Sequence, residues 1–362
     1  MRQTLLLILA SAGLSACGGA SDPDSAINPN VEANCAIPAG GGPEDVGNPR
    51  TVVGDGTAAS CTSAAFVAAV AKGGVITFNC GPDPLTIEMS ATATIFNDTG
   101  PRIVIDGGNK ITLDGGNARR ILYMNVCDEA QHWTTSNCNL QDYPQLTVQN
   151  LTFVNGNASA LGANVQGGPS GGAIFVRGGQ FKIFNSRFFN NQAAASDSDD
   201  GGGAVRVILS YDQSNHPTYI TNSTFGGLLR GNKAANGGGL SGLFSSFTIT
   251  NSLFSNNSAT GTGGNDGQGG SGGGIYMDGN DIDLRLCGTR LEGNQINAYG
   301  RGIFYVSNNH AGVLNIHHSV IRNNIDSDSW GWDVTIPQVA FHPDMPYSVT
   351  ESDIPPTFNF SF

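Results

Sequence analysis

Short hydrophobic runs separated by turn residues are the main pattern of this chain. Between residues 75 and 123 the runs have three or four residues, rich in Val, Ile, Thr and Leu, and glycine pairs, Asp-Gly or proline interrupt them. They are Val75–Phe78, Leu85–Ile87, Ile103–Ile105, Ile111–Leu113 and Ile121–Tyr123. Such runs predict β-strands. Because no helix-length segment separates them, hairpin sheets and a β-solenoid are the two arrangements left.

One segment before these runs has the pattern of a helix. Residues 64–72 are mostly Ala, Val and Phe, a Ser-Cys-Thr start precedes them at residues 60–62, and Gly73 and Gly74 follow. Threonine before a helix and glycine after it are typical cap residues. We expect this helix to cover the first coil of a solenoid, which would otherwise expose its core and an open sheet edge.

A repeat distinguishes a solenoid from hairpin sheets. One position is aromatic or aliphatic in successive segments, and the position three residues later is mostly asparagine. The first column is Phe153, Phe188, Phe225, Phe254, Leu291 and Ile321, and the second is Gly156, Asn191, Leu228, Asn257, Asn294 and Asn324. A glycine-rich element recurs between them, at Gly171–Ile174, Gly202–Val205, Gly238–Leu240, Gly273–Ile275 and Gly300–Ile303.

Stacked coils explain these columns, because one coil cannot bury its apolar side alone and stacking places like residues over like. Phe then fills the core, the Asn side-chain amides hydrogen-bond to one another from coil to coil, and Gly adopts the positive φ that sharp corners require. We therefore predict an all-β fold, a right-handed parallel β-helix over residues 51–326 with a short N-terminal capping helix. Residues 327–362 are expected to form an irregular capping tail, with Trp330, Trp332, Phe341 and Tyr347 among its aromatics.

The first residues predict export. Met1 and Arg2 precede a short apolar run at residues 5–10, which is too short to span a membrane. The sequence Leu14 to Cys17 resembles the bacterial lipobox, which implies cleavage after residue 16 and lipidation of Cys17; an ordinary signal peptide is the alternative. By the same resemblance, Gly18 implies release to the outer membrane. Residues 1–16 are thus the expected signal peptide and residues 17–50, rich in Pro and Gly, a lipidated flexible tether.

Charge and cysteine content restrict the partners and the compartment. The net charge of −12 disfavours nucleic acid and anionic membrane surfaces as partners unless cations intervene. Six cysteines besides Cys17 suit disulfides in an oxidising compartment. We predict the short-loop pairs Cys61 with Cys80 and Cys127 with Cys138. The pairing of Cys35 and Cys287 stays open, although Cys287 should point outward and bond a loop, with Cys35 as the candidate partner.

Two motifs carry a family resemblance. The Gly-Gly-Ala-Ile element together with Phe-x-x-Asn, as in Phe188 to Asn191, resembles the repeats of chlamydial polymorphic outer-membrane proteins. The opening at residues 54–57, with residues 78–81 and 105–108, resembles bacterial pectin-lyase-like β-helix proteins. The resemblance covers about residues 50–325 and implies the β-helix. It leaves activity open, because such proteins include lyases, hydrolases and members without known chemistry.

Alternation within the glycine-rich strands indicates a candidate binding face. If Ile174, Val205, Ile275 and Ile303 point inward, their neighbours point outward together. Aromatic faces beside a guanidinium and a carboxylate would bind sugar rings by apolar contact and hydrogen bonds. The candidate ligand-binding residues are Phe175, Arg177, Arg206, Tyr276, Asp278 and Phe304. The alternative is that loops cover this face and the aromatics serve packing.

Other polar clusters give weaker signals. Asp197, Asp199 and Asp200 form a solvated loop, a calcium site or, at Asp199 and Asp200, a catalytic carboxylate pair, and calcium is the one cofactor that the sequence indicates. His317 and His318 adjoin on a predicted strand, so their side chains should face opposite ways, with His318 a structural residue in an asparagine column. The Asn-Thr-Asp, Gly-His-Gly and Arg-Ile-Lys set of polygalacturonases does not occur.

These observations predict a β-helix lipoprotein of the cell envelope, anchored in the outer membrane, that binds carbohydrate or partner molecules. The expected partners are an extracellular polysaccharide or an envelope protein, with the membrane reached through the lipid. The alternative is a polysaccharide lyase or glycoside hydrolase of pectate-lyase-like type acting on an extracellular glycan. A purely structural envelope role is the third hypothesis.

Overall fold

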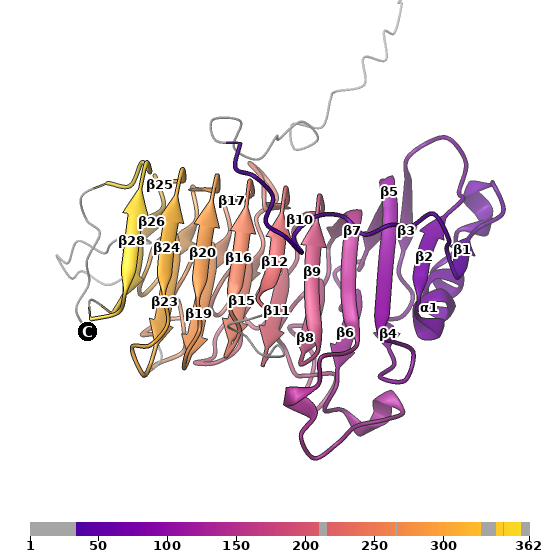
Figure 1. Ribbon diagram of the computed structural model, residues 1–362, viewed down its shortest axis with the longest axis horizontal. Coiled ribbons are helices and arrows are strands. Elements are labelled where there is room, and N and C mark those ends of the chain that lie inside the picture. The colour runs from indigo at the N-terminus through magenta and orange to yellow at the C-terminus, as the bar shows by residue number, and fades with distance from the viewer. Residues whose placement is uncertain (1–33, 210–215, 265, 327–337, 343, 356–362) are drawn as a thin grey trace, which may run out of the picture.

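The chain winds into stacked coils that form three β-sheets. The computed structural model describes residues 34–209, 216–264, 266–326, 338–342 and 344–355. Strands of successive coils pair in parallel in all three sheets. Figure 1 shows the coils side by side along the long axis, with α1 (Ser63–Lys72) at one end. This arrangement is a parallel β-helix with a capping helix, and both predictions are confirmed.

The largest sheet has 16 strands and bends around a corner of the coil. At its N-terminal end lie β1 (Thr51–Val53), β2 (Val75–Phe78), β3 (Leu85–Glu88) and the long strands β5 (Arg102–Asp114) and β7 (Gln145–Val154). One row of strands beyond β7 contains β9 (Gln180–Phe184), β12 (Thr218–Thr221), β16 (Phe247–Thr250), β20 (Leu284–Cys287), β24 (Leu314–His317) and β28 (Tyr347–Thr350). The other contains β10 (Arg187–Phe189), β13 (Thr224–Phe225), β17 (Leu253–Ser255), β21 (Arg290–Glu292) and β25 (Val320–Arg322).

Two smaller sheets close each coil. The second sheet contains β4 (Ala93–Ile95), β6 (Leu122–Asn125), β8 (Ile174–Arg177), β11 (Val205–Ile208), β15 (Leu240–Leu243), β19 (Ile275–Gly279), β23 (Ile303–Ser307) and β27 (Val339–Phe341). The third contains β14 (Lys233–Ala234), β18 (Ser258–Ala259), β22 (Gln295–Ile296) and β26 (Ile325–Asp326). Three short 3-10 helices complete the description, η1 (Ala58–Ser60), η2 (Glu129–Gln131) and η3 (Cys138–Leu140).

Local sequence explains the capping helix. The Thr62 hydroxyl accepts a hydrogen bond from the backbone N–H of Ala65 at 3.2 Å, and the helix ends at Gly73, whose φ is 66°. A side chain on Gly73 would meet the backbone oxygen of Thr99 at 2.5 Å, so this position requires glycine. Phe66 and Val70 are fully buried against the first coils, which is how the helix covers the open end of the core.

The phenylalanine column lies in register through the core as the repeat predicts. Phe153, Phe188, Phe225 and Phe254 stack with ring centroids 4.9, 4.6 and 4.5 Å apart, and all four are buried. Leu291 and Ile321 continue the same register. Stacked rings at these separations combine a large buried apolar area with favourable ring contacts. The column therefore stabilises the central coils and fixes how they are aligned.

The asparagine column forms a buried hydrogen-bonded ladder. The side-chain Nδ2 of each residue donates to the Oδ1 of the next, at 2.9 Å from Asn191 to Asn232 and 2.9 Å from Asn232 to Asn257. Asn294, Asn324 and Gln338 continue the ladder. The predicted column contained Leu228 in place of Asn232. That assignment is wrong because residues 227–231 are an insertion between β13 and β14, on which Leu228 is 69% exposed.

Residues 34–50 form a strap across the first row of strands, joined to β20 through Cys35 and running in Figure 1, in indigo, past β12, β9 and β7. Cys35 is bonded to Cys287, and its backbone exchanges two hydrogen bonds of 2.9 Å with the Asn251 side chain. Glu44 forms ion pairs with Lys182 and Arg102. Burial alone would raise the pKa of Glu44, but its hydrogen bonds and the charges of Lys182 and Arg102 lower it below its usual value.

Two predicted boundaries need correction. The flexible tether was expected to reach residue 50, whereas residues 34–50 are held against the sheet by the disulfide and by Glu44. The β-helix was expected to end at residue 326, whereas β27 and β28 add a further coil in register with β23 and β24. The signal peptide, Cys17, Trp330 and Trp332 lie outside the described residues.

Candidate functional site

The predicted binding face is in register but buried. Phe175, Arg206, Tyr276 and Phe304 occupy equivalent positions on strands of the second sheet and point away from the core. Their exposed fractions are 1%, 2%, 0% and 4%. Alternation therefore predicted the direction of these side chains correctly. It could not predict what lies over them.

Loops that lead from the largest sheet into β8 and β11 of the second sheet cover this face. Gly167 lies so close to Phe175 that a Cβ there would be 2.4 Å from the ring. Arg120, fully buried, lies over the same ring with its guanidinium 5.1 Å from the centroid and donates to the carbonyls of Gly168 and Ser170. Burial lowers the pKa of Arg120 to about 9. Of the two alternatives given by the sequence, the structure shows loop cover and packing for these four residues.

Arg206 lies under the next loop. Its guanidinium donates to the carbonyl of Asp199 at 2.6 Å and to the Ser241 hydroxyl, and burial lowers its pKa. Because the side chain is buried, a ligand arriving from solvent cannot reach the remaining N–H groups of this guanidinium. In this structure Arg206 therefore holds the loop of residues 197–201 in place.

Arg177 and Asp278 are the two predicted ligand residues that stay partly exposed. They stand at equivalent positions of β8 and β19 with two strands between them, about 14 Å apart by the usual strand spacing. Arg177 Nε lies 3.4 Å from the Asn139 side chain, and Asp278 accepts a hydrogen bond of 2.8 Å from Asn308. The structure therefore does not bring these two residues together in one site.

The aspartates at residues 197–200 shape a turn. Asp197 Oδ1 accepts from the backbone N–H groups of Asp199 and Asp200, and Asp200 Oδ1 accepts from the Ser170 hydroxyl at 2.7 Å. Burial raises the pKa of Asp200. Two groups of His, Cys, Asp or Glu converge as metal ligands would in the described part of the chain, and neither contains these aspartates.

An exposed aromatic cluster lies instead on the disulfide loop, defined here as residues 126–144 between β6 and β7. Trp133 is 38% exposed and stacks on Tyr143 with ring centroids 5.8 Å apart and planes within 9°. His132 stacks on Phe96 at 3.9 Å. The His132 Nδ1 lies 3.1 Å from Asp98 Oδ1, with both side chains about half exposed. This loop projects from the lower edge of the β-helix in Figure 1.

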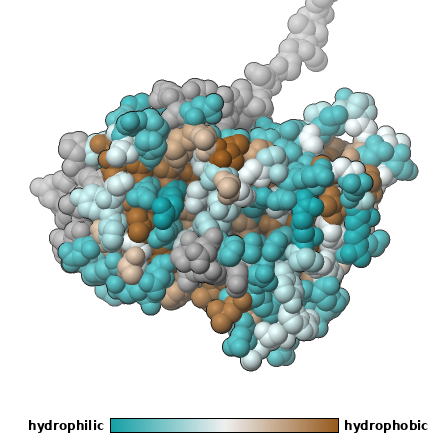
Figure 2. Space-filling view, in the orientation of Figure 1, coloured by the Kyte–Doolittle hydropathy of each residue, from teal (hydrophilic) through white to brown (hydrophobic). Residues whose placement is uncertain are grey.

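Several bonds hold this loop against the scaffold. The predicted disulfide Cys127–Cys138 closes its base, as Cys61–Cys80 closes the N-terminal opening. The Asn97 side chain donates to the carbonyl of Trp133 at 2.5 Å, and the Thr134 hydroxyl to the carbonyl of Val126 at 2.7 Å. Figure 2 shows the projecting lower edge in teal and white, with a brown patch beside it.

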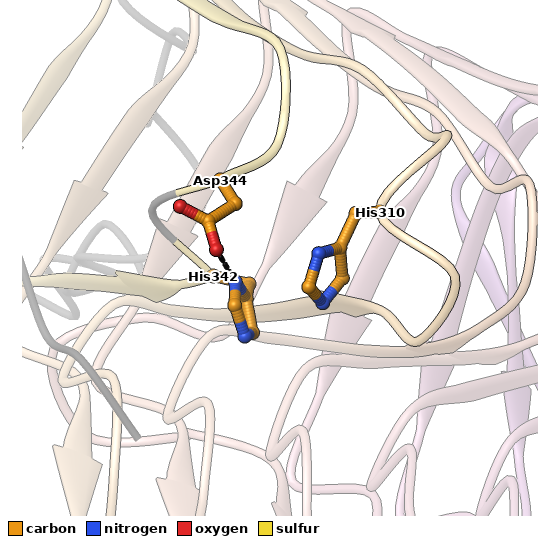
Figure 3. Close-up of side chains that lie close together, drawn as sticks. All are labelled: His310, His342 and Asp344. Atoms are coloured by element: carbon orange, nitrogen blue, oxygen red, sulfur yellow. Dashed lines mark ion pairs between the residues drawn. The ribbon is translucent and has the colours of Figure 1, made fainter.

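Histidines form a second cluster at the C-terminal end. His310 lies in the turn after β23, and His342 directly follows β27 in the next coil. Their ring centroids are 3.8 Å apart, and Asp344 faces the Nδ1 of His342 at 3.9 Å (Figure 3). The ligand atoms of these three residues all lie within 4.8 Å of one another.

A third cluster corrects the expectation for the adjacent histidines. His317 and His318 lie with ring centroids 4.0 Å apart, not on opposite faces. His318 has a φ of 43° because it occupies a left-handed corner after β24, so strand alternation stops at His317. His318 Nε2 pairs with Glu351 at 2.6 Å, and His317 Nδ1 with the Thr350 hydroxyl at 2.7 Å.

The sequence reasoning missed both the aromatic loop and the pair of His310 and His342. A signal for the loop was present, since Trp133 lies between two cysteines in a segment that interrupts the columns. The histidines had no such signal. They come together only because β23 and β27 are neighbours in register across consecutive coils, and the sequence analysis ended the repeat before β27.

Comparisons with known proteins give no family for this chain. No family model matches it, and no curated protein matches it. Among solved structures it is similar to PfbA, described as a surface adhesin of Streptococcus pneumoniae, with 14% sequence identity and a TM-score of 0.36 over 84% of this chain and 78% of that one. Among the described helices, none has the length and hydrophobicity needed to cross a membrane. The fold assignment rests on the three parallel sheets themselves.

Proposed function

We propose that this protein is a lipid-anchored β-helix of the bacterial outer membrane that binds an extracellular carbohydrate through the disulfide loop. The observation that carries the proposal is the exposed Trp133 ring, stacked on Tyr143 and held on a cross-linked loop. The lipid anchor and the compartment rest on the lipobox-like sequence before Cys17.

Aromatic rings on this loop suit sugars for a physical reason. The apolar face of a pyranose packs against a flat ring, and polar groups at the rim bond its hydroxyls. Next to Trp133 in the sequence, His132 forms a pair with Asp98, and elsewhere the loop and β8 offer the Asn139 and Arg177 side chains. Such groups can donate hydrogen bonds to sugar hydroxyls and accept hydrogen bonds from them.

Preorganisation favours binding by this loop over binding by a loose segment. A flexible loop loses conformational entropy when it binds, and a cross-linked loop loses less. The Cys127–Cys138 bond and the Asn97 contact limit the motion of the ring-bearing segment before any ligand arrives. The large β-helix core beneath it supplies a rigid support.

The test is binding to a glycan panel that includes pectate, alginate and neutral polysaccharides. We expect Trp133→Ala to weaken binding to the best-bound glycan by at least about tenfold, taking as a guide the roughly 1–3 kcal/mol that a nucleic-acid base gains by stacking on an aromatic side chain. Phe244→Ala is the matched control, because Phe244 is also an exposed aromatic, 37% accessible, on a turn after β15.

Three outcomes would contradict the proposal. They are no glycan binding by the unmodified protein, equal affinity of the Trp133→Ala and unmodified proteins, or equal losses from both variants. The same incubations, followed for unsaturated products and new reducing ends, test the alternative of a lyase or hydrolase. Mass spectrometry of the N-terminal peptide tests lipidation of Cys17, and an unmodified thiol there would contradict the anchor.

A further inference from the structure

A cluster of nitrogen and oxygen ligands joins the last two described coils of the second sheet. His310 comes from the turn after β23, and His342 and Asp344 come from the turn after β27. The two imidazoles lie face to face at 3.8 Å with planes 34° apart. Figure 3 shows both rings and the carboxylate grouped around one position. Because β23 and β27 pair in register, the turns that follow them lie next to each other and bring three side chains of metal-ligating types together.

The Nδ1 of His342 lacks a partner that its position requires. This atom is buried, and among the described residues it forms no hydrogen bond. Buried polar atoms without a partner cost free energy, so native structures rarely keep them. The nearest carboxylate oxygen, from Asp344, is 3.9 Å away and thus beyond hydrogen-bond reach. A bound cation would satisfy both groups.

The separation of these two atoms fits a shared metal ion. Zinc–nitrogen and zinc–oxygen bonds are each about 2.0–2.2 Å long, so two ligand atoms of one tetrahedral ion are about 3.3–3.6 Å apart. The 3.9 Å between His342 Nδ1 and Asp344 Oδ2 is slightly longer than this, and a small rotation of the Asp344 side chain, which is 76% exposed, would bring its oxygen to the required distance. His310 reaches the same volume, since all three ligand atoms lie within 4.8 Å of one another.

We propose that His310, His342 and Asp344 bind one divalent transition-metal ion, with zinc as the best match. Two imidazole nitrogens and one carboxylate suit zinc, whereas calcium and magnesium prefer oxygen ligands alone. Three protein ligands leave the fourth tetrahedral position to water. Because its ligands come from consecutive coils, the ion cross-links the C-terminal coil to the one before it. This inference does not depend on carbohydrate binding.

The cluster of His317, His318 and Glu351 serves as an internal control. There, His318 Nε2 already pairs with Glu351 at 2.6 Å and His317 Nδ1 with Thr350 at 2.7 Å. Metal binding would have to break the first of these contacts. At the His310 cluster, by contrast, the metal would supply the partner that His342 Nδ1 lacks among the described residues.

The experiment uses the full chain stripped of metal with EDTA. Titration calorimetry with zinc should give one equivalent of binding, and cobalt should give the visible absorption bands of a tetrahedral site. His342→Gln and Asp344→Asn should each weaken zinc binding by at least about tenfold. The double variant His317→Gln with His318→Gln should bind zinc like the unmodified protein. Zinc should raise the melting temperature of the unmodified protein and of this control.

The proposal is overturned if the unmodified chain binds no zinc, or if the His317 and His318 variant loses the binding while His342→Gln keeps it. Circular dichroism of the metal-free variants checks folding. If His342→Gln does not fold, Asp344→Asn and His310→Gln carry the test, because the Asp344 side chain is 76% exposed and His310 lies in a turn.

Discussion

Removing one member of the asparagine ladder tests whether it stabilises the β-helix. Asn257 lies in the middle of the ladder and is fully buried. Its Oδ1 accepts from the backbone N–H of Asn232 at 3.1 Å and from Asn232 Nδ2 at 2.9 Å. Its Nδ2 donates to the carbonyl of Phe225 at 2.9 Å and to Asn294 Oδ1 at 3.0 Å. Asn257→Ala deletes all four of these hydrogen bonds.

The expected cost follows from the groups left behind. Two buried donors of Asn232, its backbone N–H and one amide N–H, lose the acceptor that the structure gives them. An unsatisfied buried donor costs about 1–3 kcal/mol, so the variant should lose about 2–6 kcal/mol of unfolding free energy. The small cavity left by the side chain adds to this cost, and a water molecule entering it would reduce it.

Equilibrium urea unfolding followed by circular dichroism measures this loss. Asn137→Ala is the control, since Asn137 is exposed and its side chain does not cap the turn that follows. That change should stay within about 0.5 kcal/mol, as exposed substitutions usually do. A loss below about 1 kcal/mol for Asn257→Ala, or equal losses in both variants, would refute the reasoning that the ladder stabilises the stack.

Three further predictions concern other parts of the fold. Cys35→Ser should lower the unfolding free energy by about 2–5 kcal/mol and speed proteolysis of residues 36–50, because the disulfide holds the strap; an unchanged cleavage rate would contradict this. Phe225→Ala should cost about 3–5 kcal/mol in urea unfolding, since its ring stacks on both neighbours; Phe225→Leu is the control, and equal losses would exclude a role for ring volume. Burial raises the pKa of Asp200 above its usual value of 3.8. The contribution of protonated Asp200 to the stability of the fold is therefore fully present below pH 3.8 and is lost as the pH rises through the raised pKa. Asp200→Asn should therefore raise the melting temperature at pH 7 and not at pH 3, and an equal gain at both pH values would contradict this.

Most of the fold could be predicted from the columns of repeated residues in the sequence. Phe153, Phe188, Phe225 and Phe254 lie in register as the repeat predicts, because each side chain has the same neighbours one coil away. The one wrong member, Leu228, shows the limit of this reasoning. A constant offset from the phenylalanine cannot detect an insertion, whereas Asn232 could have been found by requiring a buried amide at every coil.

Side-chain direction was predictable only within strands. Alternation placed Arg206 and Tyr276 on the outward side of the second sheet, and the structure agrees. The same rule failed for His318, because a left-handed corner follows β24 and turns the next side chain. Alternation could not predict that the outward side of the sheet is buried. Loops such as residues 166–171 decide it, and their paths depend on contacts with Arg120 and Phe175.

In a β-helix the residues that stabilise the stack and the residues that form binding sites are different sets, and this explains why the sequence predicted the fold better than the sites. Column residues are each explained by an equivalent residue one coil away, so a column indicates packing and little else. Trp133 and His342 have no such equivalents, since the disulfide loop interrupts the stack between β6 and β7 and the turn after β27 closes it. The stack still determines where both lie, because β6 and β7 fix the ends of the loop and β23 aligns His310 with His342. Substitutions at such unrepeated positions should therefore change binding with little loss of stability in the metal-free protein, the reverse of Asn257→Ala.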